Sequence, residues 1–329
     1  MNLKFPKRQF LGKIYAFSIC FILLILSGDF FFNILAAHPG SDFSNNINSV
    51  IGASQGLYWE GFNAPSSVFQ YLIGLHFYFW LGVLSSIFQD DASLLQGITL
   101  FLTFMLVSPT LFSAAQQRNR GLLLILLVVL FMHPRFLDLV ISNIRSASAL
   151  VFVFYSLKVK GTKFKFLLMG VGATFHLAVL APIFLHLMHL FCRRLLKINS
   201  YSGLLVWLAF LAPGALIMAA KILFPQRGGG EWEGGLIYTF SIFILAAYTF
   251  FIGKRKVNNE FVFISLGLIS LDVWGYILGY STMRYFSFFF PFFAVMILLY
   301  DRKPQVLIMT FILWLLFTLA SHSFWVLSL

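Results

Sequence analysis

Charged residues are scarce in this chain, and their scarcity excludes a water-soluble domain. Only 10% of the 329 residues are Asp, Glu, Lys or Arg, whereas a typical soluble domain contains about 25%. Hydrophobic residues make up 60%, and the mean hydropathy is +0.89. Apolar runs long enough to cross a bilayer recur from end to end, so we expect one integral membrane domain over residues 1–329.

Cysteine and the common catalytic motifs are also rare or missing. Cys20 and Cys192 are too few for a disulfide framework or a metal site. His186 and His189 share a helical face, but no carboxylate or cysteine is positioned to complete a metal site beside them. The sequence contains no P-loop, dinucleotide fingerprint, HExxH or GxSxG. We therefore expect neither a metal nor another cofactor.

Acidic residues are outnumbered by basic ones, 11 to 23, which gives a net charge of +12. Such an excess can indicate nucleic-acid binding, but here the basic residues form short clusters between apolar runs. That distribution is typical of a protein oriented in a membrane by the positive-inside rule. We therefore expect no nucleic-acid partner.

The positive-inside rule also predicts the topology, with a cytoplasmic N-terminus. The arrangement with most Lys and Arg in the cytoplasm has an interfacial helix at 66–88 on the outer face and a broken helix pair at 164–191 that returns to its own side. It keeps 18 of the 23 basic residues inside, more than any of the three alternatives. Five remain on the outer side: Arg135, Arg145, Lys221, Arg227 and Arg284.

The expected fold is an all-α, polytopic transmembrane bundle of about 10 to 11 membrane segments. A long outer loop at 37–92 contains the interfacial helix, and the glycine-rich loop at 225–235 is either a mobile cover or a plain connector. Besides the broken pair, spans are expected at about 13–36, 93–115, 121–134, 146–158, 202–224, 234–253, 260–280, 284–300 and 304–324.

Arg145 and His176 are the strongest candidates for a functional site. Arg145 opens the span at 146–158 on the predicted outer side, where a guanidinium can hold a phosphate by two hydrogen bonds or anchor the helix at the interface. His176 lies about 18 Å along a helix from Phe164, near the bilayer midplane. There it can donate to an anionic oxygen or accept a proton. Gly170 and Gly172 precede it, which predicts a helix break.

Other polar residues on the predicted outer side have supporting roles. Arg284 and Arg135 are candidates for further phosphate contacts. Asp42 and Glu60 in the first outer loop are candidates for a general base or substrate contact. Asp272, in the outer part of an apolar run, is expected to pair with an arginine.

These residues resemble a known family. NIRSASALVFVFYSLKVKG followed by GVGATFHLAVL is similar to the EpsG branch of the Wzy-type bacterial polysaccharide polymerases, and SDFSNN and MRYFSFFFPF resemble two shorter stretches of that branch. The outer loop with its interfacial segment, followed by a span and a broken helix pair, is similar to the GT-C class of lipid-dependent glycosyltransferases.

The resemblance implies an inner-membrane enzyme with a periplasmic active site. Such an enzyme transfers a growing oligosaccharide from undecaprenyl diphosphate to the next undecaprenyl-diphosphate-linked repeat of an O-antigen, capsule or exopolysaccharide. Asp42 or His176 would take the acceptor proton, and a chain-length regulator is an expected partner. Two alternatives stay open: another lipid-dependent glycosyltransferase or O-antigen ligase, and a transporter (flippase) for lipid-linked oligosaccharides.

Overall fold

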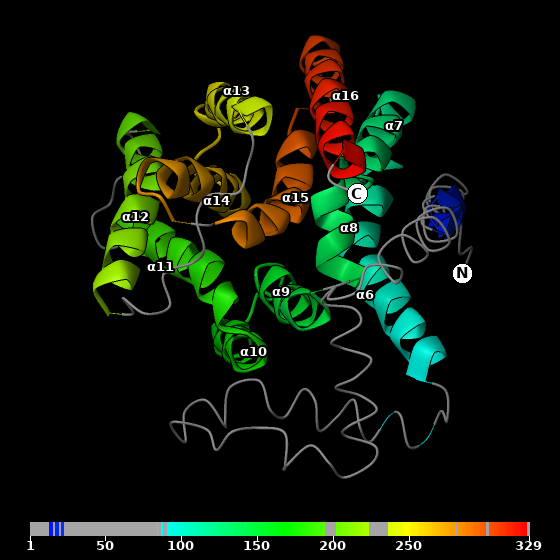
Figure 1. Cartoon of the computed structure of the whole chain (residues 1–329), viewed down its shortest axis with the longest axis horizontal. Coiled ribbons are helices and arrows are strands. Elements are labelled where there is room, and N and C mark those ends of the chain that lie inside the picture. Colours follow the sequence, from blue (N-terminus) through cyan, green and yellow to red (C-terminus); the bar gives the residue numbers. More distant parts are fainter. Residues whose placement is uncertain are drawn as a thin grey trace, which may run out of the picture. The chain divides into compact units, whose positions relative to one another are not determined.

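The computed structural model of the chain describes residues 91–141, 143–194, 202–223, 236–280, 282–300 and 303–327, together with 13–15, 17–19, 21–22, 84 and 87. Within these ranges the regular structure is helical, with no strand (Figure 1). The all-α prediction is therefore confirmed for the described part of the chain. Most of the outer loop at 37–92, including its interfacial helix, and the loop at 225–235 lie outside it.

Helices occupy every apolar segment that the sequence predicts after residue 92. They are α6 (Asp91–Ala114), α7 (Arg120–Phe131), α8 (Pro134–Ile141), α9 (Ile144–Ser156), α10 (Thr162–Phe175), η1 (Leu177–Val179), α11 (Leu180–Arg194), α12 (Ser202–Leu223), α13 (Leu236–Gly253), α14 (Glu260–Ile277), α15 (Met283–Leu298) and α16 (Pro304–Leu327). The break expected at His176 is present, because α10 ends at Phe175 and a 3₁₀ turn follows. Helix α8 was not predicted; it is bent by 62° from α7.

Several of these helices are suited to a membrane. In the described ranges, Gln96–Ala114, Leu177–Arg194 and Glu260–Ile277 are long and apolar enough to cross one, and the bent pair α7–α8 is a fourth candidate. Large apolar side chains are exposed on other helices, such as Ile222 at 75% and Ile237 at 71%. Exposure on this scale is expected of side chains that face lipid rather than water.

The chain divides into two compact units that interleave along the sequence. Unit 1 comprises Met1–Ala16, Pro109–Phe136 and Leu180–Leu329; unit 2 comprises Phe17–Ser108 and Leu137–Val179. Each unit is described by itself. The expectation of one membrane domain over residues 1–329 stays a prediction.

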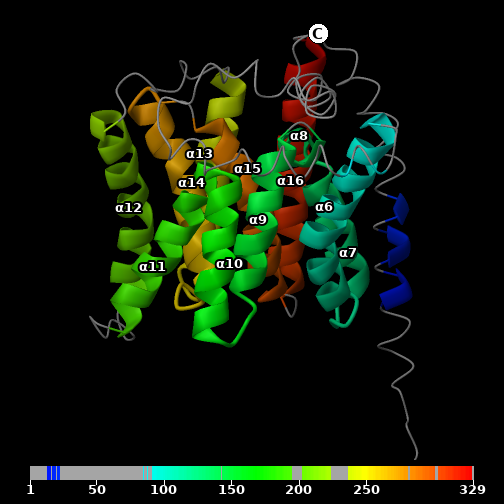
Figure 2. The same ribbon diagram turned by 90° about the horizontal axis from the view of Figure 1, so that it is seen from below.

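Helix α14 lies in the middle of unit 1. It packs against α11, α12, α13 and α15, while α16 packs against α13 and α7, and these helices run alongside one another (Figure 2). Its start is defined by Asn259, whose side chain accepts a hydrogen bond from the N–H of Phe261 at 2.9 Å, a common helix N-cap. Most of its side chains are buried, because neighbours cover it on several sides.

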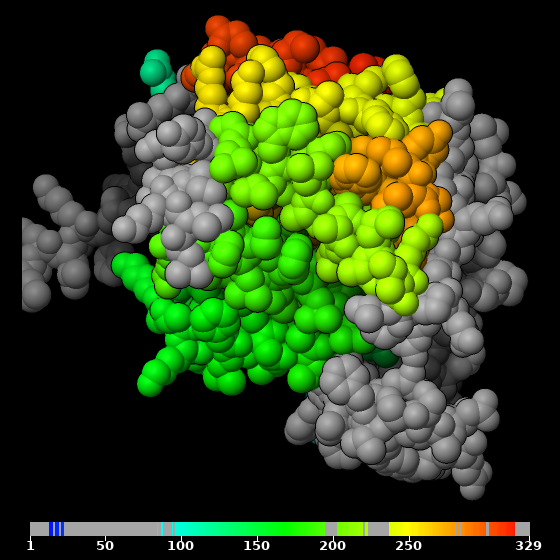
Figure 3. Space-filling view, turned by 90° about the vertical axis from the view of Figure 1, so that its left-hand side faces the viewer, coloured from blue at the N-terminus to red at the C-terminus, as the bar shows by residue number. Residues whose placement is uncertain are grey.

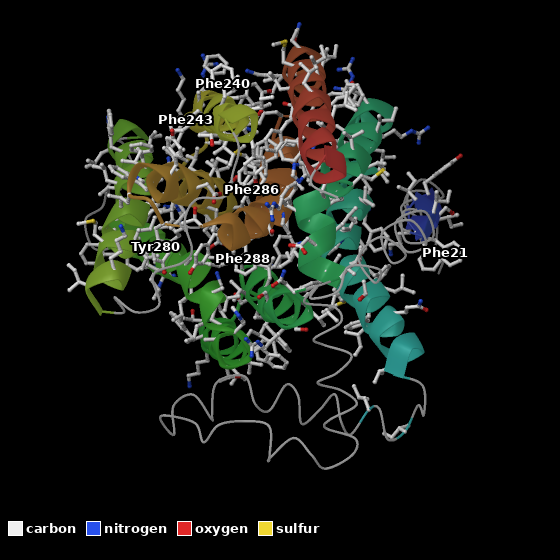
Figure 4. The ribbon with its side chains drawn as sticks, in the orientation of Figure 1. Phe21, Phe240, Phe243, Tyr280, Phe286 and Phe288 are labelled. Carbon is white, nitrogen blue, oxygen red and sulfur yellow. The ribbon has the colours of Figure 1, made fainter. Side chains whose placement is uncertain are left out.

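Aromatic side chains fill the space between α13, α15, α16 and the α7–α8 bend. The rings of Phe289 and Phe293 are stacked with centroids 4.7 Å apart, and Phe293 lies 5.4 Å from Trp314. Phe286, labelled on α15 in Figure 4, is fully buried, whereas Phe240 on α13 is 65% exposed. Aromatic pairs of this geometry add to the stabilisation from buried area, so these rings contribute to the stability of unit 1.

A tight connection joins α14 to α15. The N–H of Tyr280 donates to the carbonyl of Gly275 at 2.7 Å, and Gly279 has a positive φ of 61°. A Cβ on Gly275 would lie 2.7 Å from both the Thr282 methyl group and the Tyr280 carbonyl. The absence of a side chain at Gly275 therefore lets the chain turn back closely and brings Thr282 against the end of α14.

Candidate functional site

Helices α9 and α10 form a closely packed hairpin in unit 2. Only residues 157–161 connect them, and both contact η1 as well as each other. They approach most closely at Gly172, where an added Cβ would lie 2.9 Å from the Ala149 carbonyl and 3.1 Å from the Val153 side chain. The close approach explains why this position carries no side chain.

The hairpin brings Arg145 and His176 to the same level at its open end. His176 stands four residues after Gly172, and Arg145 stands four residues before Ala149, the residue that Gly172 contacts. Because the two helices are antiparallel, one helical turn in each leads towards the same end of the hairpin. Both side chains are half-buried. The two strongest candidates from the sequence therefore both lie at the open end of the α9–α10 hairpin.

The backbone fixes the orientation of the His176 ring. His176 is the C-cap of α10 with φ −158° and ψ 130°, an extended conformation that ends the helix. Its Nδ1 accepts a hydrogen bond from the N–H of Ala178 at 3.0 Å. A neutral imidazole that accepts through Nδ1 carries its hydrogen on Nε2. The Nε2 group is therefore the one suited to donate to an anionic oxygen.

Asp138 is a carboxylate near this site that the sequence analysis overlooked. It lies in α8 and accepts a hydrogen bond from the Asn143 side chain at 3.4 Å, and its carbonyl accepts one from the Asn143 N–H at 3.1 Å. Asn143 is the N-cap of α9, two residues before Arg145. The signal was an acidic residue flanked by apolar residues between two predicted spans. The Asp138 carboxylate therefore lies close to the start of α9, where Arg145 is located.

A second polar cluster lies in unit 1 around Asp272. The Asp272 side chain is fully buried in α14, and Arg135 and Thr282 are near enough to act on its charge. Arg135 also lies over the ring of Tyr238, with its Cζ 5.9 Å from the ring centroid. The expected pairing of Asp272 with an arginine stays a prediction, although Arg135 lies near enough to act on its charge.

The polar atoms of this cluster are incompletely paired. Both carboxylate oxygens of Asp272 and the hydroxyls of Thr282 and Tyr238 are buried without a well-aligned hydrogen bond in the described structure, although Thr282 lies close to Asp272 and Arg135 close to Tyr238. Buried polar groups without partners are rare and often mark functional sites. Arg284 follows Thr282 by two residues in the first turn of α15, but its side chain lies outside the described part.

The predicted site residues therefore fall into three groups. Arg145 and His176 lie at the same level at the open end of the α9–α10 hairpin. Arg135 belongs to the cluster around Asp272 in unit 1, and Arg284 lies in the first turn of α15 in the same unit. Asp42 and Glu60 lie outside the described residues.

The expectation for His186 and His189 was wrong in one respect. A carboxylate is present, because Glu260 at the start of α14 places Oε2 3.3 Å from His186 Nδ1. His189 instead lies with its Nε2 3.1 Å from the Asn258 carbonyl. The sequence could not show this, since Glu260 is far from α11 along the chain. No group of three or more His, Cys, Asp or Glu suited to a metal ion occurs among the described residues.

Comparison with known proteins does not identify a relative of this chain. No protein-family model matches the chain, and no curated protein or solved structure matches it either.

Proposed function

We propose that the protein is a glycosyltransferase of the Wzy type. It transfers a growing oligosaccharide from undecaprenyl diphosphate to the next undecaprenyl-diphosphate-linked repeat at the periplasmic face of the bacterial inner membrane. The proposal includes a GT-C-like bundle of about 10 to 11 membrane segments. It rests on the sequence resemblance and on one structural observation, the shared level of Arg145 and His176.

The proposed chemistry needs a cationic group, a hydrogen-bond donor and a base. The acceptor hydroxyl oxygen attacks the anomeric carbon of the growing chain, and the bond from that carbon to the diphosphate oxygen breaks. The diphosphate leaves with the bonding electrons, and the hydroxyl proton passes to the base. A fixed guanidinium and an Nε2–H donor suit the charge that develops on the departing diphosphate.

Arg145 and His176 take the first two roles in this proposal. Arg284 and Arg135 are proposed as further diphosphate contacts, and Asp42 as the base, with His176 as the alternative. Asp138 joins these as a third candidate base because its carboxylate lies near the start of α9. Glu60 is proposed to contact the substrate.

The first test is complementation of a strain that lacks this gene, scored by its polysaccharide ladder. His176→Asn is the sharpest variant, since the Asn side-chain oxygen can still accept the hydrogen bond from Ala178 N–H while the Nε2 donor is lost. We expect normal protein levels and no long chains from His176→Asn and from Arg145→Gln. Full ladders from both variants would remove the site assignment.

The phenotype of the deletion strain separates the polymerase from the flippase alternative. Loss of a polymerase leaves single repeat units attached to the final acceptor, whereas loss of a flippase leaves none. We expect single repeats. An O-antigen ligase would instead leave long chains that remain on undecaprenyl diphosphate.

A binding measurement that does not depend on the sugar complements the genetics. Native mass spectrometry of the purified protein with undecaprenyl diphosphate, undecaprenyl phosphate and undecaprenol compares two, one and no phosphate groups on one lipid. We expect the diphosphate to bind most tightly, and Arg145→Gln to reduce that preference by at least about tenfold, as for the loss of a charged hydrogen-bonded contact. Equal binding of all three lipids would contradict a diphosphate site.

A further inference from the structure

Exposed cations are gathered at the end of unit 1 where α13 and α15 finish, and four of them lie in the connections between helices. We call them the basic end: Lys254, Arg255 and Lys256 in the α13–α14 connection, and Lys303 before α16. The two connections are joined by hydrogen bonds, because the Lys256 ammonium donates to the Leu299 carbonyl at 2.6 Å. The two connections are therefore held together at this end.

Two tyrosines complete the link between these connections. The Tyr300 hydroxyl donates to the carbonyl of Ile252, and the Tyr248 hydroxyl donates to the carbonyl of Val306 at 3.0 Å. Each bond runs between the end of α13 and the α15–α16 region. The cations of the basic end are thus held near one another.

Carboxylates are too few to neutralise the basic end among the described residues of unit 1. Those residues include two, Glu260 and Asp272. Glu260 begins α14 at this end and places its carboxylate against the buried His186, whereas Asp272 stands twelve residues into α14, about 18 Å along the helix. Asp301 and Arg302 lie outside the described part and add no net charge. The surface therefore carries an excess of positive charge.

Exposed apolar side chains continue from the basic end along α13 and α16. On α13, Phe251 is 64% and Ile244 40% exposed; on α16, Ile308 is 46% and Ile312 45% exposed. The two helices pack against each other, and Figure 3 shows the yellow atoms of α13 beside the red atoms of α16. The Lys254 ammonium lies 5.1 Å from the Phe251 ring centroid, at the junction of the charged and apolar surfaces.

We propose that the basic end and the adjoining α13–α16 face bind an anionic phospholipid. The headgroup phosphate contacts Lys254, Arg255 and Lys303, and the acyl chains lie along the exposed apolar side chains. A negatively charged amphiphile fits a cationic surface that borders an apolar one. An acidic peptide or a nucleic acid would contact the cations but leave the apolar surface uncovered. This site does not depend on the proposed polymerase activity.

The test measures lipid binding by purified, delipidated protein in a neutral detergent. Native mass spectrometry compares phosphatidylglycerol with phosphatidylcholine carrying the same acyl chains. The variant Lys254→Gln/Arg255→Gln/Lys303→Gln removes three charges and leaves Lys256 and its hydrogen bond intact. The matched control, Lys160→Gln/Lys163→Gln/Lys165→Gln, removes three charges from the α9–α10 hairpin of unit 2.

We expect tighter binding of phosphatidylglycerol than of phosphatidylcholine, and a loss of that preference by at least about tenfold in the first variant, because each basic residue near an anionic headgroup strengthens binding by about fivefold. The control variant should keep most of the preference. Equal losses in both variants would mean that overall charge, not this site, attracts the lipid. Equal binding of the two lipids by the parent protein would also overturn the proposal.

Discussion

Gly170 and Gly172 are two positions apart on α10 but have different surroundings. A Cβ at Gly170 meets nothing within 4 Å, whereas one at Gly172 meets the Ala149 carbonyl at 2.9 Å. We expect Gly172→Ala to lower the free energy of unfolding by about 1–3 kcal/mol through overpacking. Thermal unfolding of purified protein in detergent measures the change.

The matched control is Gly170→Ala, which should be neutral or stabilise α10 by up to about 1 kcal/mol, since alanine favours the helix. The Gly172 variant should also lose polysaccharide chains, because the added methyl group shifts His176 relative to Arg145. Equal stability of the two variants would show that the hairpin packs more loosely than the described contacts indicate.

The buried carboxylate of Asp272 is expected to lower the free energy of unfolding of the protein. Its two oxygens are buried without a well-aligned hydrogen bond in the described structure, and a buried unsatisfied group costs about 1–3 kcal/mol, more when charged. We predict that Asp272→Asn raises the free energy of unfolding by about 1 kcal/mol and shortens the polysaccharide. Thermal unfolding and the ladder assay measure the two effects.

Ser265→Ala on the same helix provides the comparison. The Ser265 hydroxyl is also buried without a partner among the described residues, but it carries no charge. We expect this variant to keep or slightly raise stability and to leave the ladder unchanged. If Asp272→Asn instead prevents folding, the carboxylate stabilises unit 1 through Arg135, and the expected gain in stability is wrong.

The sequence identified single residues best where their chemistry conflicts with a membrane. Arg145 and His176 attracted notice because a charge or an imidazole is costly in hydrocarbon, and the structure brings them to one level. Asp138 escaped notice, since its contacts with Asn143 depend on how α8 turns into α9. Glu260 escaped for a similar reason, because its proximity to His186 joins helices far apart in the sequence.

The connection between α14 and α15 determines where the first turn of α15, which contains Arg284, lies relative to the end of α14. We predict that Gly275→Ala lowers the free energy of unfolding by about 1–3 kcal/mol, since the new methyl group would meet the backbone carbonyl of Tyr280. Chemical or thermal unfolding with a helix signal measures this.

Gly279→Asn is the control in the same connection. Gly279 has a positive φ and open space around its Cα, and asparagine tolerates this conformation better than other residues with a side chain. We expect a loss below about 1 kcal/mol. A larger loss than that of Gly275→Ala would show that backbone conformation, rather than close packing, limits this connection.

Helix positions were largely predictable, whereas helix contacts were not. Polar or basic stretches delimit the apolar runs, so the spans predicted after residue 92 agree with α6, α7, α9 and the later helices. The short α8 was missed because the span at 121–134 was expected to end at Pro134, although proline suits the first turn of a helix. The 62° bend and the pairing of α16 with α7 come from tertiary packing, which no local pattern encodes.

The distribution of basic residues over the chain is the main support for the proposed membrane topology. Within unit 1, Lys254, Arg255, Lys256 and Lys303 gather at one end, where α13 and α15 finish. Arg135, Asp272 and Thr282 lie where α13 and α15 begin. This separation agrees with the predicted sides, since the first group was expected inside and Arg135 outside.

The predicted sides can be tested with single cysteines in a variant that lacks Cys20 and Cys192. A membrane-impermeant maleimide is applied to spheroplasts before and after the membrane is ruptured. We expect Arg227→Cys to react in intact spheroplasts, and Lys160→Cys and Lys254→Cys to react only after rupture, because the charge distribution favours the cytoplasm for both loops. Reaction of Lys160→Cys in intact spheroplasts would mean that the segment at 164–191 crosses the membrane once. The open end of the α9–α10 hairpin, with Arg145 and His176, would then face the cytoplasm, and the proposed periplasmic reaction would lose its site.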